Sequence, residues 1–177
     1  METERLILRK FLSEDAKDLY EYLSLKSIYK FEPGKPVTLE ESEKIAESRS
    51  KGENFLAVEL KEEKKLIGHI YLAQNQPEEF LAWEIGYIFN PKYYNKGYAT
   101  EAVKAAIKIA FEKNKAHRVV GHCNPENIAS EKVLNKSGML LEGKFRKNVT
   151  FNNAPDGFPI WNDSLEYAIL ETDYFKK

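Results

Sequence analysis

The chain has 177 residues, of which 42% are apolar and 31% are charged, and its net charge is −1. These values are typical of a soluble globular protein of one domain, residues 1–177, and exclude the broad basic surface that nonspecific nucleic-acid binding needs. The charged start lacks the apolar region of a signal peptide, no apolar run approaches the ~18 residues of a membrane span, and one cysteine excludes an internal disulfide. We therefore expect a cytoplasmic protein that binds neither membrane nor nucleic acid.

Strand and helix patterns follow one another without a repeat or a flexible linker. Strands are predicted at residues 5–11, 55–60, 66–72, 80–89, 117–123, 140–150 and 164–171. Helices are predicted at residues 13–25, 38–51, 99–111 and 127–137. Ser13 is expected to cap the first helix, whereas a capping box from Thr38 to Glu41 begins the second, which ends at Gly52. The strand–helix–strand unit at 80–123 predicts a parallel crossover in an otherwise antiparallel sheet, and hence an α+β three-layer fold.

The segment Pro91–Ala102, PKYYNKGYATEA, is the most informative part of the chain. It feeds an alanine-rich helix, and the first amides of a helix have no intrahelical partner. With the positive end of the helix dipole they form an anion site that can hold a pyrophosphate. Gly97 permits a positive φ or a close backbone approach. The residues that would present amides, with a hydroxyl from the last, are Asn95, Lys96, Gly97, Tyr98, Ala99 and Thr100. The alternative is an ordinary helix N-terminus with a turn glycine.

A second segment, Asn124–Met139, follows the strand at 117–123. The spacing of its polar and apolar residues predicts a short two-faced helix closed by glycine, from Asn127, Ser130, Val133, Leu134 and Gly138. Together the two segments resemble the cofactor-binding core of the GNAT acyltransferases. The closest similarity is to the branch that includes the RimJ/RimL-type ribosomal-protein N-acetyltransferases.

This resemblance extends from Arg5 to about Tyr174 and rests on two motifs. The loop Tyr94–Ala99 resembles the family's Gln/Arg-x-x-Gly-x-Gly/Ala motif, and the run Asn127–Met139 resembles its Asn-x-x-Ser…Leu…Lys-x-Gly-Phe pattern. Tyr94 replaces the usual Gln or Arg, and Asn95 stands where the branch often has glycine. These departures weaken the match without removing it, because the phosphate contacts are chiefly made by the backbone.

The resemblance implies a GNAT-like mixed, mostly antiparallel sheet of about seven strands, with helices on both faces and a splayed parallel pair at the cofactor site. It implies an N-acetyltransferase with acetyl-CoA as co-substrate, which acetylates a primary amine of a protein N-terminus or a small molecule by direct transfer. Backbone groups of Ile88, Phe89 and Asn90 would pair with the pantetheine amides where the strands splay, and one amide would polarise the thioester oxygen.

In the RimL-like pattern, Asn127 hydrogen-bonds the pantetheine arm and Ser130 lies near the thioester sulfur. Many GNAT enzymes supply a tyrosine seven residues after the asparagine, but this position is Leu134 here. Ser130 therefore inherits the role of proton donor to the leaving thiolate by elimination. Helix capping by Asn127 or Asn124, with Ser130 in the first turn, is the alternative.

Glu84 is the first candidate for a catalytic base. In an extended strand it shares a face with Ala82 and Gly86, the two smallest residues of the strand, so a ligand would find room there. An amine must lose a proton before acetylation, and a carboxylate can accept it directly or through water. Many GNAT enzymes give this role to a carboxylate on the corresponding strand. Alternatively, Glu84 pairs with an arginine or a lysine on a neighbouring strand, or orients the acceptor without exchanging protons.

A covalent acyl-cysteine and a metal site are both disfavoured. His122 adjoins Cys123, but adjacent strand residues point to opposite faces, so the histidine is badly placed as a base for the thiol. A buried, inert thiol is expected. His69, His117 and His122 lack metal-ligand spacing, and we predict no metal.

The acceptor is left open among a protein α-amino terminus, a polyamine, an amino-sugar antibiotic and a free amino acid. The loops at 26–37 and 151–162 are candidates for the acceptor pocket, although the aromatics of Phe151–Trp161 equally fit a core cover or a dimer contact. The acidic residues Glu32, Glu40, Glu41 and Glu43 fit a solvated helical face better than a site for a cationic acceptor. Family habit allows a homodimer through the last strands.

Two other functions compete with the acetyltransferase. The first is a CoA-binding or regulatory domain that keeps the fold and has lost turnover. The second is a dinucleotide-binding protein, which the loop disfavours because it lacks Gly-x-Gly-x-x-Gly and the doubly wound context.

Overall fold

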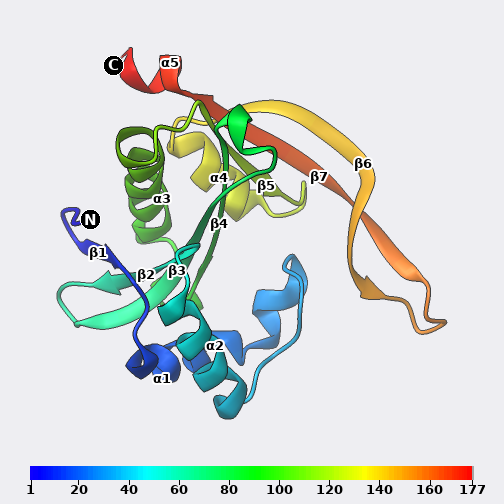
Figure 1. The fold of residues 1–177 in the computed structure, drawn as a ribbon. Helices are drawn as coiled ribbons and strands as arrows, with labels where there is room; N and C mark the ends of the chain where they lie inside the picture. The colour runs from blue at the N-terminus through cyan, green and yellow to red at the C-terminus, as the bar shows by residue number, and fades with distance from the viewer. Residues whose placement is uncertain (177) are drawn as a thin grey trace.

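One seven-stranded sheet runs through the molecule (Figure 1). The computed structural model describes residues 1–176. The strands are β1 (Leu6–Arg9), β2 (Phe55–Leu60), β3 (Lys65–Gln74), β4 (Ala82–Phe89), β5 (Arg118–Cys123), β6 (Leu140–Asn153) and β7 (Pro159–Leu170). They lie in the order β1-β2-β3-β4-β5-β7-β6, and only the β4–β5 pair is parallel. The predicted mixed sheet with a single parallel crossover is therefore confirmed.

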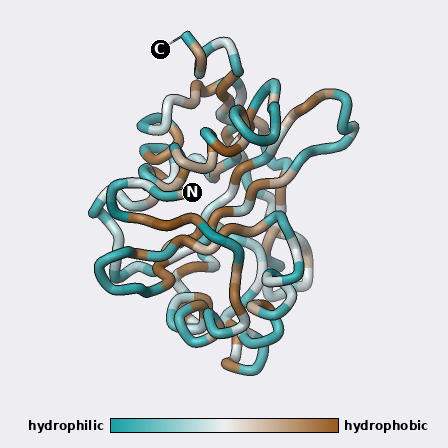
Figure 2. The backbone as a smooth tube through the Cα atoms, turned by 60° about the vertical axis from the view of Figure 1, so that its left-hand side comes forward, coloured by the Kyte–Doolittle hydropathy of each residue, from teal (hydrophilic) through white to brown (hydrophobic). Residues whose placement is uncertain are grey.

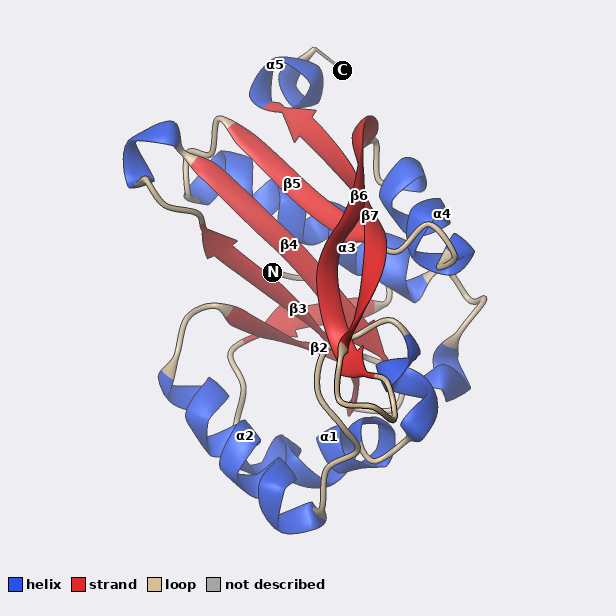
Figure 3. Cartoon of the chain, turned by 90° about the vertical axis from the view of Figure 1, so that its right-hand side faces the viewer, coloured by secondary structure: helices blue, strands red, loops and turns tan. Residues whose placement is uncertain are grey.

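Helices cover both faces of this sheet (Figure 3). They are α1 (Ala16–Leu23), α2 (Leu39–Lys51), α3 (Tyr98–Lys108), α4 (Ile128–Lys136) and the short α5 (Glu171–Phe175). Successive strand residues point to opposite faces, so Ala57 joins the buried cluster of α1 and α2, whereas Val58 joins the cluster of α3 and α4. The apolar stretches of the chain run through the middle of the molecule (Figure 2). The predicted three-layer arrangement is confirmed.

Small residues let α3 lie close to the sheet. Ala102, Val103, Ala106 and Ala110 are fully buried on the side of this helix that faces the core. The α-helix ends at Lys108, and the chain continues in a π-helical turn over Ile109–Lys113, so the helix predicted to residue 111 ends as a wider turn.

The predicted helix cap is confirmed for α2 but is wrong for α1. Thr38 accepts a hydrogen bond from the Glu41 amide at 3.2 Å and donates its own amide to the Glu41 carboxylate at 2.7 Å, which confirms the capping box. Ser13 does not cap α1; it lies in a 3₁₀ turn that precedes the helix. The reason is Asp15, whose carboxylate accepts the Leu12 amide at 2.8 Å and pairs with Arg9 at 2.7 Å.

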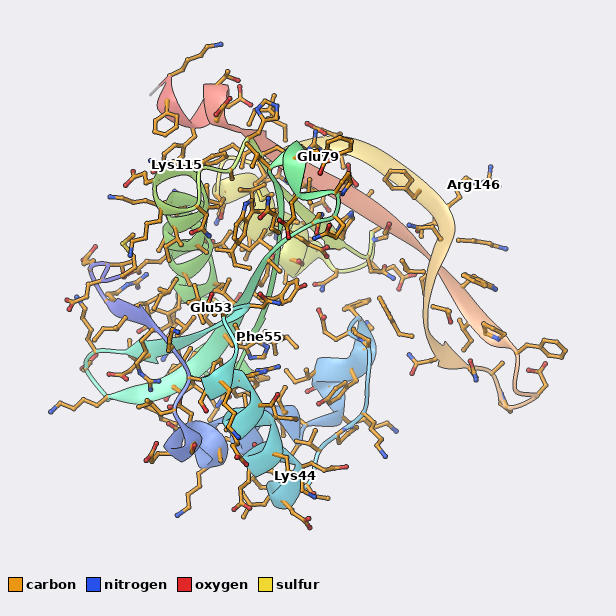
Figure 4. The ribbon with its side chains drawn as sticks, viewed as in Figure 1. Lys44, Glu53, Phe55, Glu79, Lys115 and Arg146 are labelled. Carbon is orange, nitrogen blue, oxygen red and sulfur yellow. The ribbon has the colours of Figure 1, made fainter. Side chains whose placement is uncertain are left out.

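Several strand boundaries differ from the predicted ones, and those of β4, β6 and β7 bear on the site. β4 begins at Ala82 rather than Phe80, because Leu81 has a left-handed φ of 48° that interrupts the extended chain. The segment at 151–162 is not an irregular excursion, because β6 and β7 extend through most of it and form a long hairpin that projects from the body (Figure 1). Arg146 points outward from this hairpin (Figure 4).

The parallel strands β4 and β5 separate halfway along their length. Their pairing runs from Ala82 opposite Arg118 to Ile85 opposite Gly121, whereas β4 continues to Phe89 beside β3. The second half of β4 therefore has a partner strand on one side only. This is the splayed pair that the sequence predicted.

Candidate active site

A cavity of about 460 Å³ lies on the sheet face that carries α1 and α2, and it reaches into the gap between β4 and β5. Its floor is formed by β3 and β4, its walls by the loop at 31–33 and by the β6–β7 hairpin, and its inner end by the start of α4. Both loops that were predicted to border an acceptor pocket therefore supply walls. Glu84 and Ser130, the predicted base and acid, line the same cavity from different elements.

Glu84 is held by a row of polar side chains that crosses three strands. Its carboxylate lies 3.7 Å from His122 Nδ1 on β5, and His122 Nε2 lies 3.0 Å from the Glu166 carboxylate on β7. Its interaction with Glu84, and to a smaller extent that with Glu166, raises the pKa of His122 above its usual value, although partial burial opposes this shift. The partner of Glu84 is thus a histidine rather than the lysine or arginine of the alternative interpretation.

Ser130 belongs to a small network at the start of α4. Its amide donates to the Asn127 side-chain oxygen at 3.2 Å, so Asn127 is the N-cap of α4, as the capping alternative predicted. The Ser130 hydroxyl lies 2.8 Å from the hydroxyl of Tyr87, which is also 3.0 Å from the Ser130 carbonyl oxygen. The nitrogen of the Asn127 side chain has no hydrogen-bond partner among residues 1–176, although the residue lines the cavity.

Tyr87 is the cavity residue that the sequence reasoning missed. Strand alternation places Tyr87 with Ile85 on the face opposite Glu84, and the large side chains of that face predict a role in core packing only. Burial raises the pKa of the Tyr87 phenol, so it stays protonated at neutral pH and can donate. A tyrosine near the end of an otherwise apolar strand face was the available signal, but its partner lies 43 residues away.

The loop before α3 has the backbone form that an anion site needs. Asn95 and Gly97 both have left-handed φ angles, of 60° and 83°. The Glu101 amide bonds back to the Gly97 carbonyl at 3.1 Å, and the amides before it, of Tyr98, Ala99 and Thr100, precede the first intrahelical bond. Arg5 braces the loop, since it bonds the Lys96 carbonyl at 3.0 Å and the Glu101 carboxylate at 2.7 Å.

Backbone alternation decides which of Ile88, Phe89 and Asn90 face the gap. The Asn90 amide donates to Ile67 on the β3 side at 2.8 Å, and the Asn75 amide donates to the Ala82 carbonyl. Even-numbered residues of β4 therefore direct their backbone groups to β3, and odd-numbered ones direct theirs to the side that β5 leaves. Ile88 and Asn90 are engaged with β3, whereas Phe89 and Tyr87 face the gap.

Glu32 is not on a solvated helical face, which corrects one expectation. It lines the cavity from the loop after the 3₁₀ turn at 26–30 and is partly buried. No hydrogen bond or ion pair joins its carboxylate to any of residues 1–176, and desolvation raises its pKa to about 7. A carboxyl group that titrates near neutrality can exchange protons with an amine.

The remaining histidine and cysteine expectations can be compared with the structure. Cys123 is 7% exposed and faces away from His122, so the expected burial of the thiol is confirmed, and this burial raises the thiol pKa to about 11. His69 is buried and lies 2.7 Å from the Tyr22 hydroxyl. Within residues 1–176 there is no cluster of three or more histidine, cysteine or acidic side chains placed to hold a metal. The described helices include none that is long and apolar enough to cross a bilayer.

Comparison with known proteins identifies the family. The model of the acetyltransferase (GNAT) domain matches residues 5–140. The chain is 39% identical over 174 residues to the uncharacterized N-acetyltransferase YnaD of Bacillus subtilis, covering 97% of each chain. A GNAT-family acetyltransferase structure from Bacillus anthracis matches with a TM-score of 0.88 and 37% identity, over 97% of this chain and 98% of that one. Spermidine N-acetyltransferase from Vibrio cholerae, in complex with CoA and spermine, shares the fold alone, with a TM-score of 0.79, 20% identity and coverage of 98% and 99%.

The chain therefore belongs to the GNAT family of acetyltransferases, and it is an acyltransferase. The predicted family is confirmed, whereas the narrower similarity to the RimJ/RimL type stays a prediction.

Proposed function

We propose that the protein transfers an acetyl group from acetyl-CoA directly to a primary amine. The observation that carries this proposal is a single cavity lined by Glu84 on the acceptor side and by Ser130 at the gap between β4 and β5. Acetyl-CoA would supply the acetyl group as an activated thioester. The buried thiol of Cys123, with its raised pKa, supports direct transfer over an acyl-cysteine.

The residues present fit acetyl-CoA in two places. The amides of Tyr98, Ala99 and Thr100 and the positive end of α3 suit a pyrophosphate, and Gly97 keeps side-chain atoms away from them. The backbone groups of Phe89 and Tyr87 and the free Asn127 side-chain nitrogen suit the amides of a pantetheine arm. We narrow the predicted strand contacts to Phe89 and Tyr87, since Ile88 and Asn90 are used by β3.

Glu84 would remove the proton from the acceptor amine. An α-amino group has a pKa near ~8, so a large fraction is cationic at neutral pH and needs a base. His122, held by Glu166, would fix the position of the Glu84 carboxylate in the cavity. Glu32 is a second carboxyl group in the same cavity, and with a pKa of about 7 it is suited to pass the proton on to solvent.

Ser130 would donate a hydrogen bond to the leaving thiolate as it is protonated, and Tyr87 would orient the Ser130 hydroxyl. Their hydroxyl groups are 2.8 Å apart, and the strand places Tyr87 on the opposite face from Glu84. Glu84 and Tyr87 thus lie on opposite faces of β4, which suits removal of a proton from the amine on one face and support of the leaving thiolate from the other.

Thiol release from acetyl-CoA, measured across a panel of primary amines, tests this function. Release that depends on both amine and enzyme supports the transferase. Saturable acetyl-CoA binding without release for any amine would instead favour the cofactor-binding domain that has lost turnover.

A further inference from the structure

Arg49 stands apart from the other arginines that are partly covered by the fold. It lies in the last turn of α2, and its guanidinium sits 4.0 Å above the ring centroid of Phe55 and 5.3 Å from that of Phe11. Its Nη1 atom is buried and makes no hydrogen bond, and no carboxylate lies within 4 Å among residues 1–176. Phe55 is the first residue of β2 and lies near the centre of the molecule, which shows where the Arg49 guanidinium is stacked (Figure 4).

The other covered arginines are all paired. Arg5 pairs with Glu101, Arg9 with Asp15 and Glu59, and Arg118 with Glu142, each at 2.7 Å. A guanidinium carries five donors and stays charged, so burying one without a carboxylate costs free energy that aromatic faces offset only in part. Burial accordingly lowers the pKa of Arg49 below its usual value.

Arg49 is one of the residues that line the same cavity as Glu84. Next to it on the floor are Phe55, His69 and Tyr71, none of which is an anion. His69 is neutral at physiological pH, since burial and the charge of Arg49 lower its pKa well below the usual value. Glu32 does not neutralise Arg49, because it forms no ion pair. Asp163, the remaining acid of the lining, pairs with Lys144 at 3.3 Å rather than with Arg49. The cavity thus presents carboxylates for an amine and, at Arg49, a cation that forms no ion pair with any of residues 1–176.

We infer that the acceptor carries a carboxylate as well as its amine, and that Arg49 binds this carboxylate while the amine lies at Glu84. The inference rests on the proposed function and narrows it to amino acids and related small molecules. A guanidinium can hold a carboxylate through two parallel hydrogen bonds, which would give Arg49 the anionic partner that it lacks and fix the orientation of the acceptor. Polyamines and amino sugars lack this group.

The test compares acceptors that differ only at the anionic group. Each free amino acid is assayed by thiol release beside its amide and its decarboxylated amine, with O-phosphoethanolamine as a phosphate-bearing amine. We expect at least one acid to exceed its amide in kcat/KM by tenfold or more. Arg49→Gln should raise KM for the acid about tenfold or more and change kcat/KM for the amide much less, whereas Arg49→Lys should keep part of the preference. Arg146→Gln, at an arginine that points away from the body, is the matched control.

Three outcomes overturn the inference. Amides or decarboxylated amines could be used as well as the acids, O-phosphoethanolamine could be the preferred acceptor, or Arg49→Gln could lower the use of acid and amide equally. If no compound releases thiol, the proposed function fails, and calorimetric titration with N-acetyl amino acids then decides. If the wild-type protein binds these compounds and Arg49→Gln does not, the carboxylate site is supported. If the wild-type protein does not bind them, the carboxylate site is refuted.

Discussion

At the scale of single residues, chemistry in the cavity depends on the charge state of a few groups. The Glu84 side chain is 40% exposed and has His122 on one side, so its carboxylate can reach an incoming amine while the histidine holds it in place. A change at Glu84 can be made without touching the proposed pyrophosphate site, because Glu84 lies on β4 and that site is the loop before α3.

Glu84→Gln should lower kcat by about 10²-fold or more, since a positioned base typically contributes roughly 10²–10⁴ in rate. The affinity for acetyl-CoA should stay within about twofold of wild type. Steady-state kinetics and calorimetry measure the two quantities. Glu166→Gln, which removes the other partner of His122, should cost less. Wild-type turnover in Glu84→Gln would show that the residue only shapes the cavity.

Tyr87→Phe and Ser130→Ala should each lower kcat, because each breaks the hydroxyl pair that would support the leaving thiolate. The double variant should be no slower than the slower single variant, since two residues that act as one unit are not additive. Tyr71→Phe, a cavity tyrosine whose hydroxyl has no hydrogen bond within the described chain, is the control. Fully additive effects would mean that the two hydroxyls act separately.

Glu32 should make stability depend on pH. Its folded pKa of about 7 lies above the unfolded value of ~4.3, so the folded state holds the proton more tightly. Stability is then lost as the pH rises from about 4.5 to 7, by up to about 3 kcal/mol. Glu32→Gln should remove this loss, and it should be more stable than wild type at pH 8 but not at pH 4.5. Urea unfolding at both pH values measures the free energy of unfolding, with Glu43→Gln, at an exposed residue, as the control. The same stability difference between Glu32→Gln and wild type at both pH values would contradict the prediction.

At the scale of secondary-structure elements, periodicity predicted which segments form strands and helices, but not where all of them end. The left-handed Leu81 shortens β4, and apolar patterning carries no information about φ. The residues at 151–157 include the Pro and Gly of a turn, yet cross-strand pairing extends β6 and β7 almost to that turn. Tertiary pairing thus overrides local turn signals.

Replacement of Gly97 in the loop before α3 should weaken the binding of acetyl-CoA. At a φ of 83° any β-branched side chain is strained, and a Cβ there would lie 3.4 Å from Arg5 Nη2. Gly97→Val should therefore weaken acetyl-CoA binding by about tenfold or more, as measured by calorimetry. Gly157→Val has a similar φ of 87° in the open hairpin turn, so it should leave the affinity unchanged. Equal affinities in both variants would undo the assignment of the loop.

At the scale of the whole molecule, the splay of β4 and β5 joins the cofactor side and the acceptor side of the sheet into one site. The mixed sheet could be predicted because the crossover between residues 80 and 123 must be parallel. The walls of the acceptor cavity could not, because Glu32, Arg49 and Asp163 come from segments that meet only after folding. Association of two copies through the last strands stays a prediction; Phe158 and Trp161 on that hairpin are 70% and 52% exposed.

Calorimetric titration of the protein with acetyl-CoA, with NAD as a control, tests the central claim most directly. The account predicts saturable binding of acetyl-CoA with one site per chain and no binding of NAD. An absence of acetyl-CoA binding would contradict it, and it would mean that Tyr94 and Asn95 have removed the pyrophosphate site from an otherwise intact fold.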